Sequence, residues 1–360
     1  MNTGWNFMDK FYLELFYSEC PAIPTYHVSA LENIEIKKSV SIYVTHQCNL
    51  RCKTCYLNAG LPLKYEMKLD NYKNIFPKIK NLGFELIYIL GGEPLLHKEI
   101  FEIISLAKEN DFVVSMSSNG FFIDKIKAEK LKKSGLDQIQ ISIDSANEMI
   151  NDNIRGDKSF KNAINAIKNL KNVGLKVSIA FTITKYYNNV EEMVRLAKSL
   201  DVDVLNVSIV QPFGRAKEND IAPDKHLIKE AIEKLKMYKN EIKLTFNGFR
   251  FYLNKKIFDE SLKNIPMGYN SCPAGKERFV IDSNGNIYGC ELLMNEYFLE
   301  GNVLKDDINK IWESGFKLFR ERVIPEYCNH CNFKQSCQGG CPARSFSTDL
   351  FQKKDSLCYF

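Results

Sequence analysis

The chain has 360 residues, of which 45% are hydrophobic and 26% are charged, as in an ordinary globular protein of about two domains. The net charge of +5 comes from 49 basic and 44 acidic residues. The lysines are spread along the chain, which argues against a nucleic-acid partner. The N-terminus lacks a secretory pattern, and no apolar run reaches the roughly 18 residues of a membrane span, so we expect a cytosolic protein without a membrane partner.

Six segments have the pattern of short β-strands. They are apolar, or alternate apolar with polar side chains, and they are rich in β-branched residues. In chain order they are SVSIYVTH from Ser39, ELIYIL from Glu85, FVVSMS from Phe112, QIQISID from Gln138, KVSIAFTIT from Lys176 and VDVLNVSIV from Val202.

Between these strands, apolar residues recur with helical spacing. The positions are Ile100, Ile103, Ile104 and Ala107, then Ala163, Ile164, Ile167 and Leu170, then Met193, Val194, Ala197 and Leu200. Residues 70–82 also have a helical pattern, which Pro77 is expected to kink or shorten. The alternation predicts an α/β fold with a parallel sheet. Six units are fewer than the eight of a closed barrel, so we expect a partial (β/α)6 TIM-like barrel.

Polar segments follow five of the predicted strands, at the edge where such folds carry their chemistry. Each segment alone has the composition of an ordinary turn. Five in order at the same edge favour a functional site instead. They are THQCNLRCKTCY, GGEP, SSNG, SIDS and QPFGRA.

The eleven cysteines fall into two clusters. Three lie within residues 48–55, seven lie between Cys272 and Cys358, and Cys20 stands apart. An odd count in a chain without an export signal argues against disulfides and for metal ligation. The first cluster has no fourth cysteine nearby, whereas a structural metal site needs a full ligand set. We therefore expect a small molecule to fill the open position.

The first cluster resembles the signature of the radical S-adenosylmethionine (SAM) enzymes. Cys48-x3-Cys52-x2-Cys55 is followed by the GGEP turn after the second strand, in the order that this family has. One departure is Thr54, which stands where the family usually has an aromatic residue. The resemblance spans roughly residues 40–215.

This resemblance implies that three thiolates hold a [4Fe-4S] cluster with one open iron, to which SAM binds. A 5′-deoxyadenosyl radical then takes hydrogen from the substrate. The implied SAM contacts are Gly91, Gly92 and Glu93 toward the amine, Ser118 and Asn119 toward the ribose, and Ser142 and Arg155 toward the carboxylate. Arg155 suits a carboxylate through its planar, permanent charge, although a plain surface charge is the alternative.

The C-terminal cysteines resemble the SPASM extension of radical SAM enzymes, which binds two auxiliary [4Fe-4S] clusters and would make three clusters in all. Its interleaved pattern implies one cluster on Cys328, Cys331, Cys337 and Cys358, and another on Cys272, Cys290 and Cys341. The second set is one ligand short. A substrate group, a water, His330 or Cys20 are the alternatives for its fourth ligand, and zinc is the alternative metal for the whole group.

These features predict four regions. They are an N-terminal extension (1–38), a radical SAM partial barrel (39–215), a bridging segment (216–270) and a cysteine-rich SPASM domain (271–360). Within the last region, RFVIDSNGNIYGC predicts a hairpin turning at Asn284-Gly285 that returns Cys290 toward Cys272. DDINKIWESGFKLFRER, residues 306–322, predicts one amphipathic helix.

The predicted activity is an oxidation in which an auxiliary cluster accepts the second electron. In resembling enzymes the substrate is a peptide or protein side chain, which gains a crosslink, thioether or aldehyde. A small-molecule or cofactor-biosynthetic oxidation, for example of a tetrapyrrole, is the second hypothesis, and a non-catalytic electron carrier is the third.

Both oxidase hypotheses require partners and a proton acceptor. The implied electron donor is an external flavodoxin or ferredoxin. Only 47 residues precede Cys48, which is marginal for a domain that grips a leader peptide. Asp144 is the candidate proton acceptor, with capping of the following segment as its alternative role.

Overall fold

The computed structural model describes residues 38–238, 241–247, 272–331, 334, 338–345, 353–355 and 358. Cys20, Cys337 and residues 1–37 of the predicted N-terminal extension lie outside the described residues. In the part of the chain that is described, no helix combines the length and the apolar character needed to cross a membrane.

One curved sheet organises the chain, and it contains all six predicted strands. The strand order is β10-β9-β8-β1-β2-β3-β4-β5-β6-β7, and every neighbouring pair from β8 to β7 is parallel. The predicted strands correspond to β1 (Ser39–Tyr43), β2 (Leu86–Leu90), β3 (Val113–Ser118), β4 (Gln138–Ser142), β5 (Lys176–Ile183) and β6 (Val204–Ile209).

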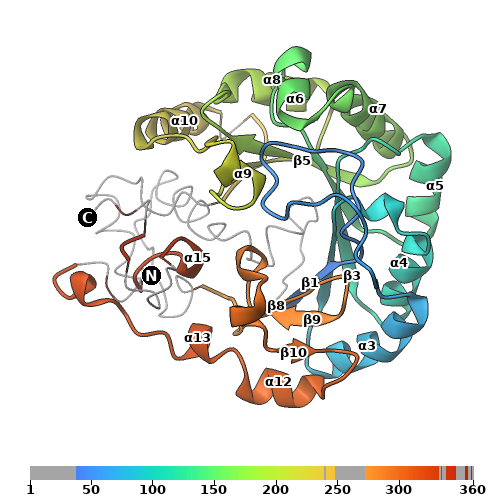
Figure 1. The fold of residues 1–360 in the computed structure, drawn as a ribbon. Helices are drawn as coiled ribbons and strands as arrows, with labels where there is room; N and C mark the ends of the chain where they lie inside the picture. The colour runs from blue at the N-terminus through green and yellow to red at the C-terminus, as the bar shows by residue number, and fades with distance from the viewer. Residues whose placement is uncertain are drawn as a thin grey trace, which may run out of the picture.

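The helices form an outer layer around this sheet, as Figure 1 shows. They are α3 (Leu69–Asn81), α4 (Ile100–Glu109), α5 (Lys125–Lys133), α6 (Glu148–Arg155), α7 (Ser159–Asn172), α8 (Val190–Ser199) and α10 (Lys225–Met237). The short α9 (Arg215–Glu218) lies inside this layer, and Arg215 lines the interior cavity. The predicted apolar face of α4 is buried, and those of α7 and α8 are largely so. Pro77 does not end α3, which continues to Asn81. The partial TIM-like barrel is therefore confirmed.

The sheet extends beyond the six predicted strands on both sides. β7 (Leu244–Asn247) pairs with β6, and β8 (Arg278–Ile281) pairs in parallel with the first strand of the chain, Ser39 opposite Arg278. This pairing carries the segment before Cys290 to the start of the barrel. The boundaries predicted at residues 38, 215 and 270 stay a prediction.

The predicted hairpin is confirmed, whereas the predicted 306–322 helix is wrong. β8 and β9 (Asn286–Tyr288) are antiparallel, and Gly285 turns between them at φ +87°. β10 (Gly301–Asn302) follows. Two short helices, α12 (Ile308–Ser314) and α13 (Lys317–Arg320), replace the single helix. The break occurs because Phe316 takes a left-handed φ of +59° and donates its N–H to the Glu300 carboxylate instead of to a helical carbonyl.

Strand side chains alternate between the helices and the barrel interior. In β2, Ile87 and Ile89 are fully buried in the apolar core, while Tyr88 between them lines an interior cavity. β4 repeats this arrangement, with Ile139 and Ile141 in the core and Gln140 on the cavity. The sheet therefore presents a polar inner wall.

Candidate active site

The loop that carries the first three cysteines follows β1 and is closed by main-chain hydrogen bonds. The N–H of Cys48 donates to the oxygen of Gly60 at 2.8 Å, and the N–H of Gly60 donates to His46 at 3.0 Å. Halfway along the loop, the N–H of Lys53 donates to Ile154 of α6 at 2.8 Å. The three thiols are thus held on a fixed backbone rather than on a free loop.

Arg215, in the QPFGRA segment after β6, fastens this loop from the far side of the barrel. Its N–H donates to the oxygen of Cys55 and its Nε to that of Cys52, both at 2.9 Å. Its Nη1 donates to Ala59 at 3.1 Å. Gly214 before it takes φ +52°, and a Cβ there would lie 2.5 Å from the oxygen of Tyr56, so only glycine fits. Sequence reasoning noticed this segment but gave Arg215 no role.

The GGEP turn packs directly against the backbone that leads into Cys48. A Cβ on Gly92 would lie 2.3 Å from the oxygen of Gln47, and one on Gly91 would lie 2.8 Å from that of Thr45. The N–H groups of Gly92 and Glu93 donate to those two oxygens at 2.8 Å. The glycines are therefore required by the contact between two loops.

Glu93 is fully buried and connects the ends of two strands. Its carboxylate accepts hydrogen bonds from Ser118 Oγ and from the N–H of Asn119, both at 2.8 Å, and from the N–H of Leu95 at 3.2 Å. Burial raises the pKa of Glu93, although these hydrogen bonds oppose the shift. The Asn119 amide in turn contacts Asn49 at 2.9 Å, beside Cys48.

Arg155 and Asp144 form a buried ion pair behind the same loop. Arg155 Nη1 lies 2.8 Å from Asp144 Oδ2, and the carboxylate also accepts from the N–H of Thr182 and from Thr54. Burial disfavours the charge of Arg155, but the thiolates of Cys52 and Cys48 and the carboxylate of Asp144 outweigh it and raise the pKa. The Nε of Arg155 is buried and has no hydrogen-bond partner among the described residues.

The described C-terminal cysteines form two groups in space. Cys290 lies within electrostatic range of Cys272 and Cys341, and burial together with these neighbours raises its pKa to about 12. Cys328 lies near Cys331 and Cys358, and its pKa is raised by burial and then by these two thiols. The structure thus brings together the members of each predicted set that it describes.

The first three cysteines line the same cavity as Cys272, Cys290 and Cys341, and this cavity has a volume of about 320 Å³. Six of the seven predicted SAM contacts lie on its wall, and Glu93 is behind it. Asp144 is likewise not among the lining residues. The predicted residues on the wall are Cys48, Cys52, Cys55, Gly91, Gly92, Ser118, Asn119, Ser142, Arg155, Cys272, Cys290 and Cys341.

A neutral hydrogen-bonded ladder crosses the inner wall of the barrel. Tyr88 Oη lies 2.5 Å from Ser117 Oγ, and Gln140 Nε2 donates to Ser117 at 3.1 Å. Asn206 Nδ2 donates to the oxygen of Gln140 at 2.5 Å. Sequence reasoning missed these residues, although the polar positions in QIQIS already indicated an inward-facing polar stripe.

The donor chemistry fits iron–sulfur clusters. Cysteine thiolates are the usual ligands of such clusters, and burial holds the pKa of Cys52 at about 11, so metal binding must displace its proton. Among the described residues, no three His, Cys, Asp or Glu side chains converge on a position for a single metal ion. A cluster does not require that convergence, because each thiolate binds a different iron.

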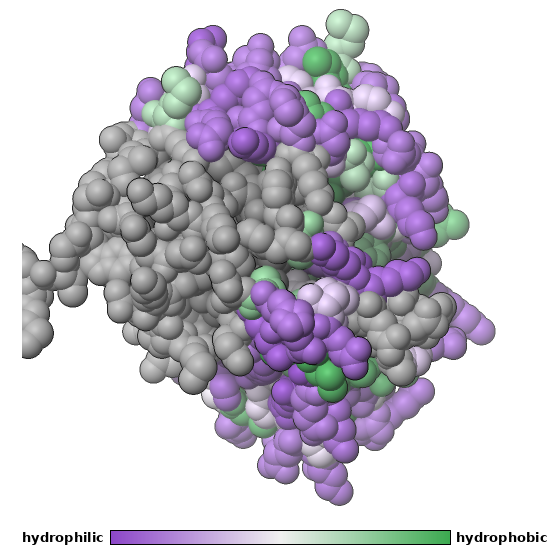
Figure 2. All heavy atoms as spheres, turned by 90° about the vertical axis from the view of Figure 1, so that its left-hand side faces the viewer, coloured by the Kyte–Doolittle hydropathy of each residue, from purple (hydrophilic) through white to green (hydrophobic). Residues whose placement is uncertain are grey.

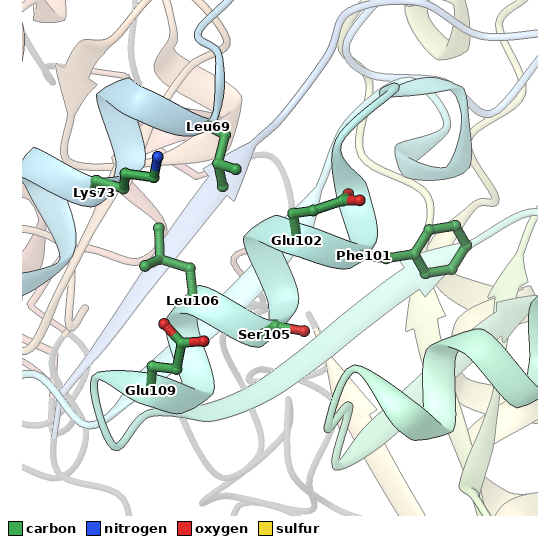
Figure 3. Close-up of a pocket in the computed structure, with 7 residues that line it drawn as sticks. All are labelled: Leu69, Lys73, Phe101, Glu102, Ser105, Leu106 and Glu109. Carbon is green, nitrogen blue, oxygen red and sulfur yellow. The ribbon is translucent and has the colours of Figure 1, made fainter.

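A second hollow lies outside the barrel and is unrelated to this site. It is a surface groove of about 340 Å³ between α3 and α4, lined by Leu69, Lys73, Phe101, Glu102, Ser105, Leu106 and Glu109, as Figure 3 shows. It shares no lining residue with the cysteine cavity.

On the face drawn in Figure 2, the described side chains are mostly hydrophilic, with apolar ones scattered among them.

Known proteins share these features in both sequence and fold. A sequence profile described as the Radical SAM superfamily matches residues 42–200, and an iron-sulfur cluster-binding domain, SPASM, matches residues 272–332. The mycofactocin maturase MftC of Mycolicibacterium smegmatis is 31% identical over 317 residues, which cover 85% of this chain and 78% of that protein. The AdoMet-dependent heme synthase of Methanosarcina barkeri is 27% identical over 340 residues, which cover 88% and 95%.

Among solved structures, Streptococcus suis SuiB bound to the precursor peptide SuiA has a TM-score of 0.75. The two chains are 20% identical, and the match covers 93% of this chain and 79% of SuiB. At that identity the likeness concerns the fold.

Proposed function

Because the chain belongs to the radical SAM superfamily and carries a SPASM domain, we propose that it oxidises a side chain of a peptide or protein substrate. It is an enzyme that binds SAM and a [4Fe-4S] cluster, and its SPASM domain binds auxiliary iron–sulfur clusters. When bound, SAM and its cluster supply a 5′-deoxyadenosyl radical that takes a hydrogen atom from the substrate.

One observation carries the oxidase proposal: the two cysteine groups share one cavity. Removing a hydrogen atom leaves a substrate radical, and a two-electron oxidation needs an acceptor for the second electron. Cys272, Cys290 and Cys341 line the cavity that a substrate would occupy. A cluster held there would lie close enough to the substrate radical to accept its electron. A protein that only relayed electrons would need no such space beside the open triad.

In this proposal Cys48, Cys52 and Cys55 hold the SAM-binding cluster. Cys272, Cys290 and Cys341 hold one auxiliary cluster, and Cys328, Cys331, Cys337 and Cys358 hold the other. Arg215 supports the first set by fixing the carbonyls of Cys52, Cys55 and Ala59. This arrangement keeps the first three thiols in place while the fourth iron position stays open to SAM.

The proposed SAM contacts divide between the cavity wall and a supporting layer. Gly91, Gly92, Ser118, Asn119, Ser142 and Arg155 contact the cofactor directly. The free Nε–H of Arg155 supports a carboxylate contact, since a buried donor without a partner is costly. Glu93 holds Ser118 and Asn119 in place, and Asp144 holds Arg155.

The peptide class rests on the relatives. MftC is named a maturase, and SuiB was solved with a precursor peptide. The proposed products are a crosslink, a thioether or an aldehyde. The proposed electron donor is an external flavodoxin or ferredoxin of the cytosol.

The test uses the full chain, reconstituted anaerobically, with a short cysteine- or glycine-rich peptide encoded beside its gene. We expect peptide-dependent formation of 5′-deoxyadenosine and loss of two hydrogen atoms from the peptide by mass spectrometry. A peptide that neither stimulates SAM cleavage nor changes mass contradicts the peptide proposal.

A second candidate is oxidation of a tetrapyrrole. The heme synthase relative favours it, because the match covers 95% of that protein. The same assay with a porphyrin precursor in place of the peptide distinguishes the two. SAM cleavage that depends on the tetrapyrrole, with an oxidised tetrapyrrole as product, supports this candidate over the first.

A further inference from the structure

A fully buried arginine, Arg278, lies on β8 inside the barrel. Its neighbour Phe279 packs outward against Trp312, so the alternation of the strand turns Arg278 to the interior. There Nη2 donates to Ser41 Oγ at 3.1 Å and forms an ion pair with the carboxylate of Glu291. Nε and Nη1 have no hydrogen-bond partner among the described residues.

Glu291 is the residue that follows Cys290, and it lines the cavity that the cysteines share. Its side chain is 9% exposed, and its Oε1 accepts from Ser41 Oγ at 3.3 Å. The sequence therefore places a carboxylate one residue from a cysteine, and the fold places a permanent cation against that carboxylate. Neither charge is needed to hold the hairpin, whose turn is closed by main-chain bonds and the Asp282 carboxylate.

Buried charges act strongly on a nearby redox centre because little water screens them. Glu291 follows Cys290 directly and lines the same cavity, and Arg278 is paired with Glu291, so both charges lie close to the centre that Cys290 would hold. Reduction adds one negative charge to a centre, so a cation beside it favours the reduced form and an anion favours the oxidised form.

We propose that Glu291 neutralises the charge of Arg278 beside the centre held by Cys272, Cys290 and Cys341, and so keeps the reduction potential of that centre from rising. This inference rests on the cluster assignment of the proposed function. As a neutral pair the two charges largely cancel, whereas Arg278 alone would favour the reduced form of the centre. When the substrate radical passes its electron to this centre, the radical is oxidised by one electron and the centre is reduced by one.

The test is a redox titration of the reconstituted full-length enzyme, followed by electron paramagnetic resonance. The signal that disappears in Cys290→Ala identifies the centre. In Glu291→Gln, Arg278 stays charged without its counter-ion, so we expect the potential to rise. The ratio of reduced to oxidised centre at a fixed applied potential should increase about tenfold, which is about 59 mV for a one-electron couple.

The double variant Glu291→Gln, Arg278→Gln removes both charges and should return the potential toward that of the parent. Asp137→Asn is the control, because it removes one partner of the Lys108–Asp137 pair (2.7 Å) just before β4, at the opposite end of the strands from the cysteines. If Glu291→Gln loses the signal, its recovery in the double variant supports the proposal, and loss in both overturns it.

An unchanged potential in Glu291→Gln also overturns the proposal. So does a double variant whose potential rises as much as that of Glu291→Gln. Failure of the proposed function looks different. In that case Cys290→Ala removes no signal from the parent spectrum.

Discussion

The side chain of Arg215 donates from Nε to the main-chain oxygen of Cys52 at 2.9 Å, across 163 residues of sequence. Together with its bonds to Cys55 and Ala59, this contact joins the end of the sixth strand to the loop after the first. The barrel is open, so this clamp makes a connection that strand pairing between β1 and β6 does not provide.

Replacing Arg215 should therefore weaken the first cluster site. Lysine keeps the charge but cannot reach two carbonyls with one planar fork, so we expect Arg215→Lys to cost about 2 kcal/mol of folding free energy and to lower iron occupancy. Denaturant unfolding of the metal-free chain and iron analysis measure these effects. Arg195→Lys is the control, since Arg195 is exposed and pairs with Glu191 one helical turn away. If both variants lose the same stability and the same amount of iron, the proposed role of Arg215 is contradicted.

Arg155→Gln should weaken SAM binding roughly 10- to 100-fold, the range expected when a charged hydrogen bond of about 1.5–3 kcal/mol is lost. Equilibrium dialysis of the reconstituted protein with labelled SAM measures it. Arg155→Lys, which retains the charge without the fork, should fall between the parent and the glutamine variant. If Arg155→Gln binds SAM as tightly as the parent does, Arg155 does not contact SAM.

Gly92→Ala should damage the SAM site more than Gly60→Ala, although both glycines belong to the same pair of loops. The new methyl group at residue 92 meets the main-chain oxygen of Gln47 at 2.3 Å, whereas at residue 60 it meets the far end of the Arg51 side chain at 3.1 Å. We expect Gly92→Ala to lose about 2 kcal/mol of folding free energy and Gly60→Ala to lose less than about 0.5 kcal/mol. Thermal unfolding and SAM affinity test the difference, and similar losses would contradict it.

Cys290→Ala and Cys331→Ala should each remove a different auxiliary cluster. Cys290 neighbours Cys272 and Cys341, while Cys331 neighbours Cys328. Each variant is therefore expected to lose about four irons per chain and to keep the signal that the other loses. Iron analysis combined with resonance spectra checks this, and loss of the same signal in both variants would show a single shared centre.

Local patterns were sufficient to predict the barrel strands. In QIQIS and LIYIL the alternation of side chains already separates the helix face from the interior, so the strands and the edge that carries the cysteines followed from the sequence. The cysteine sets came from a resemblance instead. Spacing alone left zinc and iron both open for the residues after Cys272.

Long-range contacts were beyond sequence reasoning. Nothing near Arg278 signals that its strand pairs with β1, because the two strands are separated by the whole barrel in the chain. The same holds for Arg215, whose partners are main-chain oxygens that carry no sequence signature. The predicted helix of residues 306–322 failed for a related reason, since the Glu300 carboxylate that captures the N–H of Phe316 comes from a different segment.

The most direct measurement of the central claim is SAM cleavage by the reconstituted chain under dithionite without oxygen. If Cys48, Cys52 and Cys55 hold a cluster with one open iron, the parent produces 5′-deoxyadenosine and methionine, and Cys52→Ala produces neither above background. The account is contradicted if the parent, with iron bound, yields no more 5′-deoxyadenosine than Cys52→Ala.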